Sequence, residues 1–454
     1  MGEPDTQGRR PVTASAPRSD VKPVGRRITV LHLITDLNGV GGAETALYNL
    51  LRYMDHDRFA SEVIVLRTKG TEGTIGDQIE KLGVPVHELG LRRAELGFRS
   101  LVALARTIRA IEPDIVQTWL YHPDVIGGIV ARLCGVRPVI WNLRSSPPRK
   151  GEARATTHWV FRLGRILSGS IPYRIVCCSE RALTEHVAAG FSARKMVLIR
   201  NGFDAGRYRP DPQARLSVRT ELGVASNALL VGLVARFHAD KDHATFVRSA
   251  GLLARSGDGF VARHDVHFVL CGQGVDPGNR TLAEWIDETG LTERFHLLGR
   301  RTDMPRLMAS LDIAALSSVS EAFPNVVGEA MSCGVPCAVT DVGDCGRIVG
   351  DTGGVVPPGN PAALAAAIVE LLAIGEAGRR QLGARARARV CELFPLESVV
   401  AQYEGLYASL CESRAQRDAP QADAAADIAA PVVRSVTAPS TLPGVARGTR
   451  RARD

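Results

Sequence analysis

The sequence lacks the features that mark secreted, disulfide-stabilised or membrane-spanning proteins. Aromatic residues make up only 5% of its 454 residues, and its nine cysteines are scattered and form no CxxC pair. Neither a disulfide framework nor a zinc ribbon is expected, and a reducing cytoplasm is the simplest compartment. No apolar run approaches the roughly 20 residues of a membrane-spanning helix. Residues 1–26 contain no apolar core of the kind a secretory signal needs.

The charge balance is basic, with a formal net charge of +8. Such charge suits an anionic membrane surface or an anionic substrate. No recognition helix, zinc finger or RNA-binding signature accompanies it, so nucleic acid is not expected as a partner.

Short apolar β-branched runs alternate with amphipathic helical patterns along two stretches of the chain, which predicts parallel sheets covered on both faces. Strands are expected at residues 28–33, 61–66, 86–89, 115–117, 138–141, 175–178 and 197–199, and then at 229–234, 266–270, 295–298, 313–316, 336–340 and 354–356. The predicted organisation is a disordered segment at 1–26, a first doubly wound domain at 27–205, a second doubly wound domain with terminal helices at 206–411, and a disordered tail at 412–454. Two doubly wound domains of this kind face a cleft.

Two carboxylates frame the most informative stretch, Glu321-Ala-Phe-Pro-Asn-Val-Val-Gly-Glu329. Pro324 suits the first position of a helix, and Gly334 suits its end, where a left-handed backbone is needed. Glu329 is therefore expected in the second helical turn, with Glu321 just ahead of the positive N-terminus. Free N–H groups at that terminus favour an anion. Two acceptors for sugar hydroxyls beside a phosphate-binding helix end predict a nucleotide-sugar site.

Cations follow the strand at 229–234, in the segment Arg236-Phe-His-Ala-Asp-Lys241. The carboxyl end of that strand directs Arg236 and Lys241 into the cleft. The arginine fork and the mobile lysine charge together can neutralise a departing diphosphate. The alternative is a solvated basic loop that precedes a helix.

A glycine-rich turn, Asn38-Gly-Val-Gly-Gly-Ala-Glu44, follows the first strand and opens a helix. Its glycines let backbone N–H groups approach a phosphate closely. A dinucleotide fingerprint and a purely structural turn are the alternatives. The second strand ends Leu66-Arg67-Thr68, without the acidic residue that a dinucleotide ribose needs.

The loop Thr118-Trp-Leu-Tyr-His-Pro123 makes His122 the best histidine candidate on the side of the cleft that the first domain forms. Its ring could bond a sugar hydroxyl, or its carbonyl could face developing positive charge. A capping histidine before a proline-started helix is the alternative. Asp55-His-Asp57 spells the DxD of metal-dependent sugar transferases, but it precedes a strand and is interpreted as a polar turn. No metal site is predicted.

The segment from Arg144 to Arg165 is basic and aromatic, with Trp159 and Phe161 beside arginines. A helix of this composition can lie on an anionic membrane interface. Core packing with solvated arginines is the alternative interpretation.

Together these motifs closely resemble the family 4 retaining glycosyltransferases over about residues 28–410. The paired glutamates in this order with the arginine and lysine are the specific part of the resemblance, whereas each glycine motif alone is not specific. The motifs that carry it are Gly39-Val-Gly-Gly-Ala-Glu44, Asn201-Gly-Phe-Asp204, Arg236 with Lys241, Cys271-Gly-Gln-Gly274, Leu298-Gly-Arg300, and Glu321 with Glu329.

The resemblance implies an α/β protein of the GT-B fold, with two Rossmann-like doubly wound parallel-sheet domains facing a cleft and disordered tails. It implies that the domain at 27–205 binds the acceptor and that the domain at 206–411 binds the nucleotide sugar. It implies that Arg236 and Lys241 hold the diphosphate, Glu321 a hydroxyl of the donor sugar, and Glu329 the ribose hydroxyls. The other donor-binding positions that it implies are Gly41, Gly42, Gly272, Arg300 through its backbone, Ala322, Phe323, Asn325 and Val326.

On the acceptor side, His122 aligns loosely with a histidine of the family. A second histidine, which many relatives carry after the strand at 138–141, is replaced here by Asn142-Leu-Arg-Ser145-Ser146. The resemblance implies that neither an essential metal nor a cofactor is needed. It also implies that the substrate is a UDP- or GDP-linked sugar.

The sequence therefore predicts a retaining glycosyltransferase that moves a sugar from a nucleoside-diphosphate sugar to a glycan or lipid-linked acceptor. Cell-surface polysaccharide or glycolipid synthesis is the expected process. The expected location is the cytoplasm, with peripheral contact to the inner face of the cytoplasmic membrane. The alternatives are a non-catalytic nucleotide-sugar-binding scaffold, a sugar epimerase on the same fold and, more distantly, a dehydrogenase.

Overall fold

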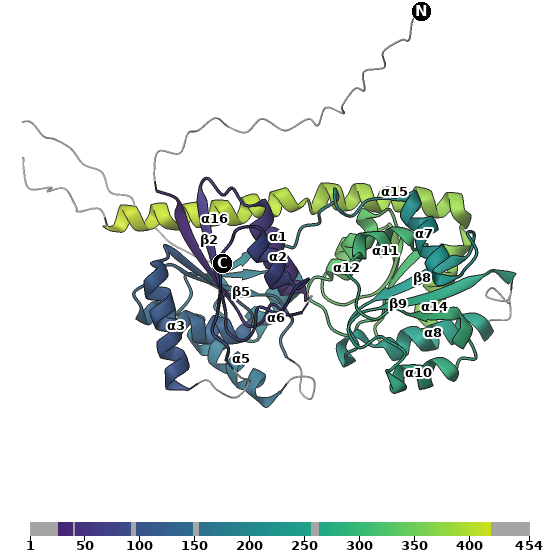
Figure 1. The fold of residues 1–454 in the computed structure, drawn as a ribbon, viewed down its shortest axis with the longest axis horizontal. Coiled ribbons are helices and arrows are strands. Elements are labelled where there is room, and N and C mark those ends of the chain that lie inside the picture. The colour runs from purple at the N-terminus through teal and green to yellow at the C-terminus, as the bar shows by residue number, and fades with distance from the viewer. Residues whose placement is uncertain (1–25, 40, 92–96, 149–153, 256–262, 419–454) are drawn as a thin grey trace, which may run out of the picture. The chain divides into compact units, whose positions relative to one another are not determined.

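A computed structural model describes residues 26–39, 41–91, 97–148, 154–255 and 263–418 (Figure 1). Residues up to Cys411 belong to one compact unit. Within that unit the strands form two fully parallel sheets, as the alternating pattern predicts.

The first sheet has seven strands in the order β3-β2-β1-β4-β5-β6-β7. The strands are β1 (Ile28–Ile34), β2 (Phe59–Val65), β3 (Val86–Glu88), β4 (Ile115–Trp119), β5 (Val139–Leu143), β6 (Arg174–Cys177) and β7 (Met196–Leu198). The helices between them are α1 (Gly42–Tyr53), α2 (Ile75–Lys81), α3 (Phe98–Ile111), the π-helix η1 (Pro123–Gly127), α4 (Gly128–Leu133), α5 (Ala155–Leu167) and α6 (Glu180–Ala188).

The second sheet has six strands in the order β10-β9-β8-β11-β12-β13. The strands are β8 (Leu229–Val234), β9 (Val266–Cys271), β10 (Phe295–Leu297), β11 (Ile313–Leu316), β12 (Cys337–Thr340) and β13 (Gly353–Val356). The helices are α7 (Pro212–Leu222), α8 (His243–Arg255), α10 (Arg280–Asp287), α11 (Met304–Ser310), α12 (Asn325–Ser332), α13 (Cys345–Val349), α14 (Pro361–Ala373), α15 (Gly375–Leu393) and α16 (Leu396–Asp418).

Each sheet buries both faces, because successive strand residues point to opposite sides. On β8, for instance, Leu230 packs into one core cluster while Val231 and Leu233 pack into another. Figure 1 shows α8, α10 and α14 on one side of this sheet and α7, α11 and α12 on the other. The strands therefore read as nearly continuous apolar runs, which is typical of parallel sheets covered by helices.

The strand order reverses at one point in each sheet, and ligands of open α/β sheets bind at such points. In the first sheet the reversal lies between β1 and β4, which lead into the Gly41–Gly42 turn and the His122 loop. In the second it lies between β8 and β11, which lead into Lys241 and Glu321. These predicted site residues thus follow the strands at which ligands are expected.

Helix α16 packs on the first sheet rather than the second. Its residues Tyr403 and Tyr407 belong to the core cluster that contains β1 and β2 side chains. Tyr407 donates a hydrogen bond to Oε1 of Gln117 on β4 at 2.5 Å, and Asn142 on β5 donates to the Tyr403 hydroxyl at 3.0 Å. Helix α16 therefore brings the chain back to its first sheet.

All thirteen predicted strands are present, with boundaries that shift by one or two residues. Two boundary predictions differ from the structure. Residues 396–411 were expected to belong to the second domain, but the tyrosines of α16 draw them into the core of the first. The tail expected to be disordered from residue 412 is helical through Asp418. The predicted disorder of residues 1–25 and 419–454 lies outside the described residues.

Within the described ranges no single helix is long and apolar enough to span a bilayer. Helices α14 and α15 would meet the length and composition requirement only together, and the chain bends by 106° between them.

Candidate functional site

An ion pair joins the loops that follow β8 and β11. Lys241 Nζ lies 2.5 Å from Glu321 Oε1. Both side chains are largely buried, with 22% of the lysine and 12% of the glutamate side chain exposed. Eighty positions separate the two residues in the chain, yet the adjacent strands β8 and β11 bring them together. The structure thus brings together two of the four side chains that are predicted to be catalytic.

Hydrogen bonds fix both partners of this ion pair. Ser318 donates to Glu321 Oε1 at 2.8 Å, and Thr340 at the end of β12 donates to the Ser318 carbonyl at 2.6 Å. On the other side, Ser317 donates to the Lys241 carbonyl at 2.8 Å. Both hydrogen bonds that the described residues give the Glu321 carboxylate end on Oε1. Its second oxygen is therefore open to a hydroxyl donor.

Arg236 is exposed directly after β8, where a glycine allows the chains to approach closely. A Cβ on Gly272, at the end of β9, would lie 2.1 Å from the Ala235 carbonyl oxygen, so no other residue fits there. Phe237 N–H donates to the Gln273 carbonyl at 2.8 Å and ties the two loops together. The predicted positions Arg236 and Gly272 therefore share one corner of the site.

The N-terminus of α12 opens toward the same region. Asn325 is the first helical residue and Pro324 is the N-cap, so the helix begins one residue later than the sequence suggested. The first N–H groups of a helix have no intrahelical partner, so the backbone from Asn325 onward is suited to an anion. The carbonyl of Ala322 accepts a hydrogen bond from Asp344 N–H at 3.0 Å, which holds this loop in place.

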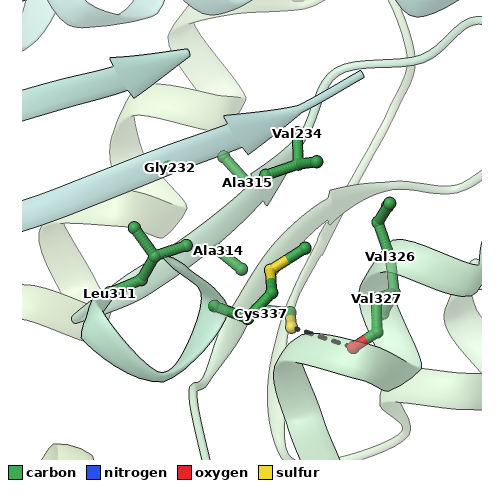
Figure 2. A pocket seen from close by; sticks show the side chains of 9 residues that line it. Gly232, Val234, Leu311, Ala314, Ala315, Val326, Val327 and Cys337 are labelled. Carbon is green, nitrogen blue, oxygen red and sulfur yellow. Dashed lines mark hydrogen bonds between the residues drawn. The ribbon is translucent and has the colours of Figure 1, made fainter. Parts of the chain in front are cut away.

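The side chains of this loop and helix also build the core beneath the site. The Phe323 ring stacks on Phe203 at 5.8 Å between centroids. Val326 and Val327 line a small apolar hollow against β8 and β11 (Figure 2). Its volume of about 10 Å³ is far too small for a nucleotide. Because their side chains pack in the core, Phe323 and Val326 would have to contribute to a donor site through backbone groups, and their donor-binding role stays a prediction.

The glycine-rich turn of the first sheet lies near the start of α12. Gly41 is the N-cap of α1 and Gly42 its first residue. A Cβ on Gly42 would lie 3.9 Å from Asn325 Nδ2. Glu44 folds back over Gly41, and burial raises the pKa of its carboxyl, while the charges of Arg236 and Arg144 act to lower it. The structure thus brings predicted donor-binding residues of the two sheets, Gly42 and Asn325, next to each other.

Glu329 lies in the second turn of α12, as predicted, but it does not contact the Lys241–Glu321 pair. Its carboxylate accepts a hydrogen bond from the Tyr208 hydroxyl. Burial raises its pKa to about 7, whereas the charge of Arg207 and the Tyr208 hydrogen bond oppose that rise. Glu329 is thus a carboxyl group whose charge changes near neutral pH.

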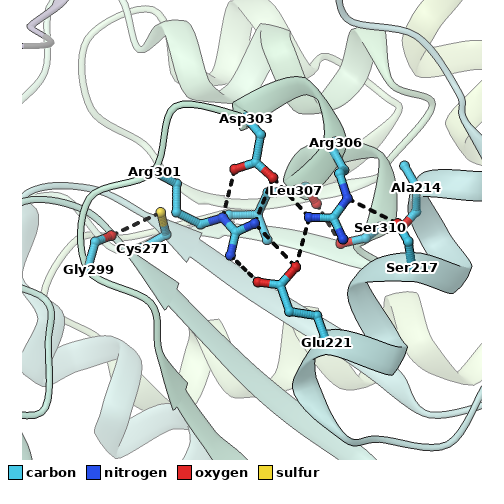
Figure 3. A network of polar contacts seen from close by, with 10 residues as sticks. All are labelled: Ala214, Ser217, Glu221, Cys271, Gly299, Arg301, Asp303, Arg306, Leu307 and Ser310. Carbon is cyan, nitrogen blue, oxygen red and sulfur yellow. Dashed lines mark hydrogen bonds and ion pairs between the residues drawn. The ribbon is translucent and has the colours of Figure 1, made fainter. Parts of the chain in front are cut away.

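Arg300 lies in a loop that hydrogen bonds fix on both sides. Gly272 N–H donates to the Gly299 carbonyl at 2.8 Å, and Gly299 N–H donates to the Val275 carbonyl at 2.7 Å. Next to it, Arg301 binds Glu221 on α7 at 2.5 Å and Asp303 at 2.6 Å (Figure 3). The hydrogen bonds from Arg301 and Arg306 hold the pKa of Asp303 down at about 2. The loop is therefore rigid at the position where the base is expected.

His122 directly precedes Pro123 of the π-helix η1, and burial lowers the pKa of its imidazole. Leu120, two residues earlier, has φ of +75°, a strained conformation for a non-glycine residue. Both features are frequent at functional sites. Within the described residues no hydrogen bond joins His122 to another side chain, so its predicted catalytic role stays a prediction.

Several residues at this site were missed from the sequence. Ser146 donates from Oγ to the Glu321 carbonyl at 3.0 Å. Arg144 donates to Asn201 Oδ1, and Asn201 donates to Asn325 Oδ1 at 2.6 Å. Two motifs were available as signals. Asn201-Gly-Phe-Asp204 was used for the resemblance without a role for its asparagine, and Asn142-Leu-Arg-Ser145-Ser146 was recognised only as a departure from the family pattern.

The residues that the structure describes contain no group of three or more His, Cys, Asp or Glu side chains placed to hold a metal ion. The segment Asp55-His-Asp57 makes local turn contacts, in agreement with its interpretation as a polar turn: Asp57 N–H donates to Asp55 Oδ1 at 3.0 Å.

Two family models match the chain, one on each sheet. Glycosyltransferase Family 4 matches residues 40–207, and Glycosyl transferases group 1 matches residues 228–373. The chain belongs to the family 4 glycosyltransferases. It is therefore a glycosyltransferase, as its motifs predicted.

Curated relatives agree with this assignment. The putative glycosyltransferase EpsF of Bacillus subtilis is 26% identical over 317 residues, which cover 69% of this chain and 79% of that protein. A second relative is the Escherichia coli UDP-Gal:alpha-D-GlcNAc-diphosphoundecaprenol alpha-1,3-galactosyltransferase. It is 24% identical, over 54% of this chain and 62% of its own.

Solved structures confirm the GT-B fold. Anabaena HepE in complex with UDP and glucose superposes with a TM-score of 0.72 at 23% identity, covering 85% of this chain and all of its own. Sucrose-phosphate synthase from Thermosynechococcus elongatus superposes with a TM-score of 0.69 at 19% identity, covering 86% of this chain and all of its own.

The raised pKa of Glu329 predicts a pH-dependent cost to stability. Between the ordinary glutamate pKa of 4.5 and about 7, the folded glycosyltransferase binds more protons than the unfolded chain. The free energy of unfolding therefore falls as pH rises through this window. Glu329→Gln should remove that part of the fall, so the variant should gain on the wild type by on the order of 2 kcal/mol between pH 5 and pH 8.

Denaturant unfolding at both pH values measures this difference. The exposed Glu284→Gln on α10 is the matched control and should follow the wild type at both pH values. Parallel pH profiles for wild type and Glu329→Gln would contradict the assignment.

Proposed function

We propose that this glycosyltransferase transfers a sugar from a UDP-sugar, with retention of anomeric configuration, to a glycan or lipid-linked acceptor in cell-surface polysaccharide or glycolipid synthesis. The observation that carries the proposal is the Lys241–Glu321 pair beside the N-terminus of α12, at the strand-order reversal of the second sheet. UDP is the proposed nucleotide because HepE binds UDP and the E. coli relative is named for UDP-Gal.

The proposed mechanism relies on cations of the chain to stabilise the departing diphosphate. Arg236 and Lys241 approach it from the β8 side, and the first N–H groups of α12 approach it from the β11 side. Preorganised donors aimed at developing charge are usually the largest single contribution to catalysis. In this assignment no divalent metal is required, because cationic side chains and backbone N–H groups stabilise the negative charge of the diphosphate that a metal would otherwise neutralise.

The proposed stereochemistry follows from the same arrangement. Glu321, oriented by Ser318 and Lys241, holds the donor sugar through its open oxygen. The acceptor hydroxyl attacks on the face that the diphosphate leaves, and a diphosphate oxygen takes its proton. No separate general base is then needed. His122, neutral because burial lowers its pKa, is assigned to the acceptor side.

Nucleotide selectivity tests the donor assignment. UDP at about 100 times its dissociation constant should add about 2.7 kcal/mol to the stability of the folded protein, and GDP and ADP at the same concentration should add much less. Thermal unfolding with the three nucleotides measures this difference. A larger shift with GDP would overturn the choice of base, and no shift with any of the three would overturn the nucleotide-sugar assignment.

Single substitutions test the role of the cations. Arg236→Ala and Lys241→Ala should each raise the barrier by about 3 kcal/mol, which corresponds to a fall in kcat of roughly 100-fold. The change in KM for the UDP-sugar should be much smaller. Release of UDP from the UDP-sugar, with and without a glycan acceptor, measures turnover.

Arg248→Ala, an exposed arginine on α8, is the control and should retain wild-type turnover. Turnover within a few-fold of wild type in both cation variants would contradict the mechanism. Interconversion of the sugar in place of UDP release would indicate the epimerase alternative.

A membrane-facing helix fits a lipid-linked acceptor. Helix α5 exposes three large apolar side chains on one stripe, Trp159 (69%), Leu163 (42%) and Ile166 (69%). Arg154, Arg162 and Arg165 are also exposed, and the helix contains no acidic residue. Its other apolar residues, including Phe161, pack against the core. The inner face of α5 thus packs in the core, and we assign the outer face to an anionic bilayer.

Vesicle binding tests this surface. The wild type should sediment with phosphatidylglycerol vesicles and much less with phosphatidylcholine vesicles, and salt should weaken the binding because the charges are exposed. Trp159→Gln combined with Ile166→Gln should lose most of the binding, since each exchange removes about 1.5–3 kcal/mol of apolar burial. UDP binding should not change.

Leu216→Gln is the control, because Leu216 is a 51% exposed apolar residue on α7, a helix that packs beside the second sheet and far from α5 in the sequence. Equal sedimentation of the α5 double variant and the wild type would contradict the membrane assignment.

A further inference from the structure

We propose that Arg144 and Asn201 are positioning residues that determine which end of the Asn325 amide faces the donor diphosphate. This inference rests on the proposed function, since it concerns how that donor is held. Neither Arg144 nor Asn201 was among the predicted site residues. The two form a hydrogen-bonded chain that begins after β5, passes through the segment that follows β7, and ends at the first residue of α12.

Each link in this chain has a defined donor and acceptor. The Arg144 guanidinium donates to Asn201 Oδ1. Asn201 Nδ2 donates to Asn325 Oδ1 at 2.6 Å. Asn201 is only 7% exposed, so its amide has little access to water that could replace these partners. In the part of the chain that the structure describes, Asn325 Nδ2 donates to no other residue.

The direction of the chain follows from the chemistry of its first member. An arginine side chain has donors and no acceptor. The atom of Asn201 that meets it must therefore be the amide oxygen, and the Asn201 NH₂ group must face Asn325. A donor facing Asn325 requires the oxygen of that amide, which leaves the Asn325 NH₂ group pointing away. An asparagine alone cannot set this orientation, because its two ends are nearly the same size.

The NH₂ group that remains lies where the diphosphate is expected. Gly42 of the glycine-rich turn would place a Cβ 3.9 Å from Asn325 Nδ2. The first N–H groups of α12 and the Lys241–Glu321 pair lie in the adjoining loop and helix. An amide oxygen in this position would repel a phosphate oxygen, whereas an NH₂ group donates to it. The chain therefore adds one oriented donor to the site.

The arginine that starts the chain is itself held in place. Its guanidinium carbon lies 5.5 Å from the centroid of the buried Trp119 ring. Its Nε is buried and has no hydrogen-bond partner among the described residues. No described carboxylate forms an ion pair with it, so its NH₂ group is not drawn away from Asn201. A fixed cation makes a reliable origin for the direction of the chain.

Asn201→Asp is the most direct test, because it reverses the last link without removing the first. The aspartate still accepts from Arg144, but it has no NH₂ group to offer Asn325. Asn325 must then donate its own NH₂ group to the aspartate and turn its oxygen toward the diphosphate. We expect the dissociation constant for UDP to rise by about tenfold or more, while that for uridine stays within about twofold.

A pair of substitutions at Arg144 provides the second arm. Arg144→Lys retains a donor-only group and should keep the selectivity for UDP over uridine. Arg144→Met removes the group that sets the direction, so both asparagines can flip, and the UDP dissociation constant should rise several-fold. Calorimetric titration of the full-length protein with UDP and with uridine measures both constants, and thermal unfolding checks that each variant is folded.

The outcomes separate this inference from the proposed function. A wild type that does not bind UDP would overturn the proposed function. A wild type that binds UDP, with unchanged selectivity for UDP over uridine in Asn201→Asp and Arg144→Met, would overturn the positioning role alone. If Asn201→Asp does not fold, the comparison of Arg144→Lys with Arg144→Met decides, and equal selectivity in those two variants would overturn it. A purely structural role would weaken UDP and uridine binding to the same extent.

Discussion

The site depends on one electrostatic constraint, which is that a lysine and a glutamate share a largely buried position between two loops. Lys241 and Glu321 attract each other strongly because little water screens them. Each would be costly to bury alone. Their pairing therefore keeps the Lys241 ammonium group beside the N-terminus of α12. Without the carboxylate, this ammonium group and the positive end of the helix dipole would repel each other. Ser318, bonded to the same carboxylate oxygen, limits how the pair can move.

This constraint can exist only because of the order of the strands. Parallel strands place all their carboxyl ends on one edge, and the reversal between β8 and β11 opens a gap between the helices that follow them. The first sheet repeats the arrangement between β1 and β4, where the Gly41–Gly42 turn and the His122 loop emerge. Sheet topology thus explains why residues that are distant in sequence carry one chemistry, and why the motif glycines occur where backbones must approach closely.

The fold could be predicted from the sequence because alternating apolar runs determine strands almost by themselves. The paired glutamates and the basic loop after β8 were recognisable because each is a local pattern. The partners of these residues were not recognisable. Glu329 accepts a hydrogen bond from Tyr208. Thr340 donates to the Ser318 carbonyl, and Asp344 N–H donates to the Ala322 carbonyl. All three donors come from segments whose contacts depend on tertiary packing. Helix α16 was misassigned for the same reason, since its tyrosines find Gln117 and Asn142 only in the folded chain.

Charge balance explains how such a site can persist without its substrate. Arg236, Arg144 and Lys241 bring positive charge to it, and Glu321 and Glu44 bring negative charge from the second and first sheets respectively. Burial weakens the ionisation of Glu44, while Arg236 and Arg144 support it. Glu44, folded back over Gly41, is therefore a negative charge that the chain itself supplies close to these cations. The positive charge of the site is thus partly compensated within the chain, which lowers the cost of keeping these cations together in the folded protein.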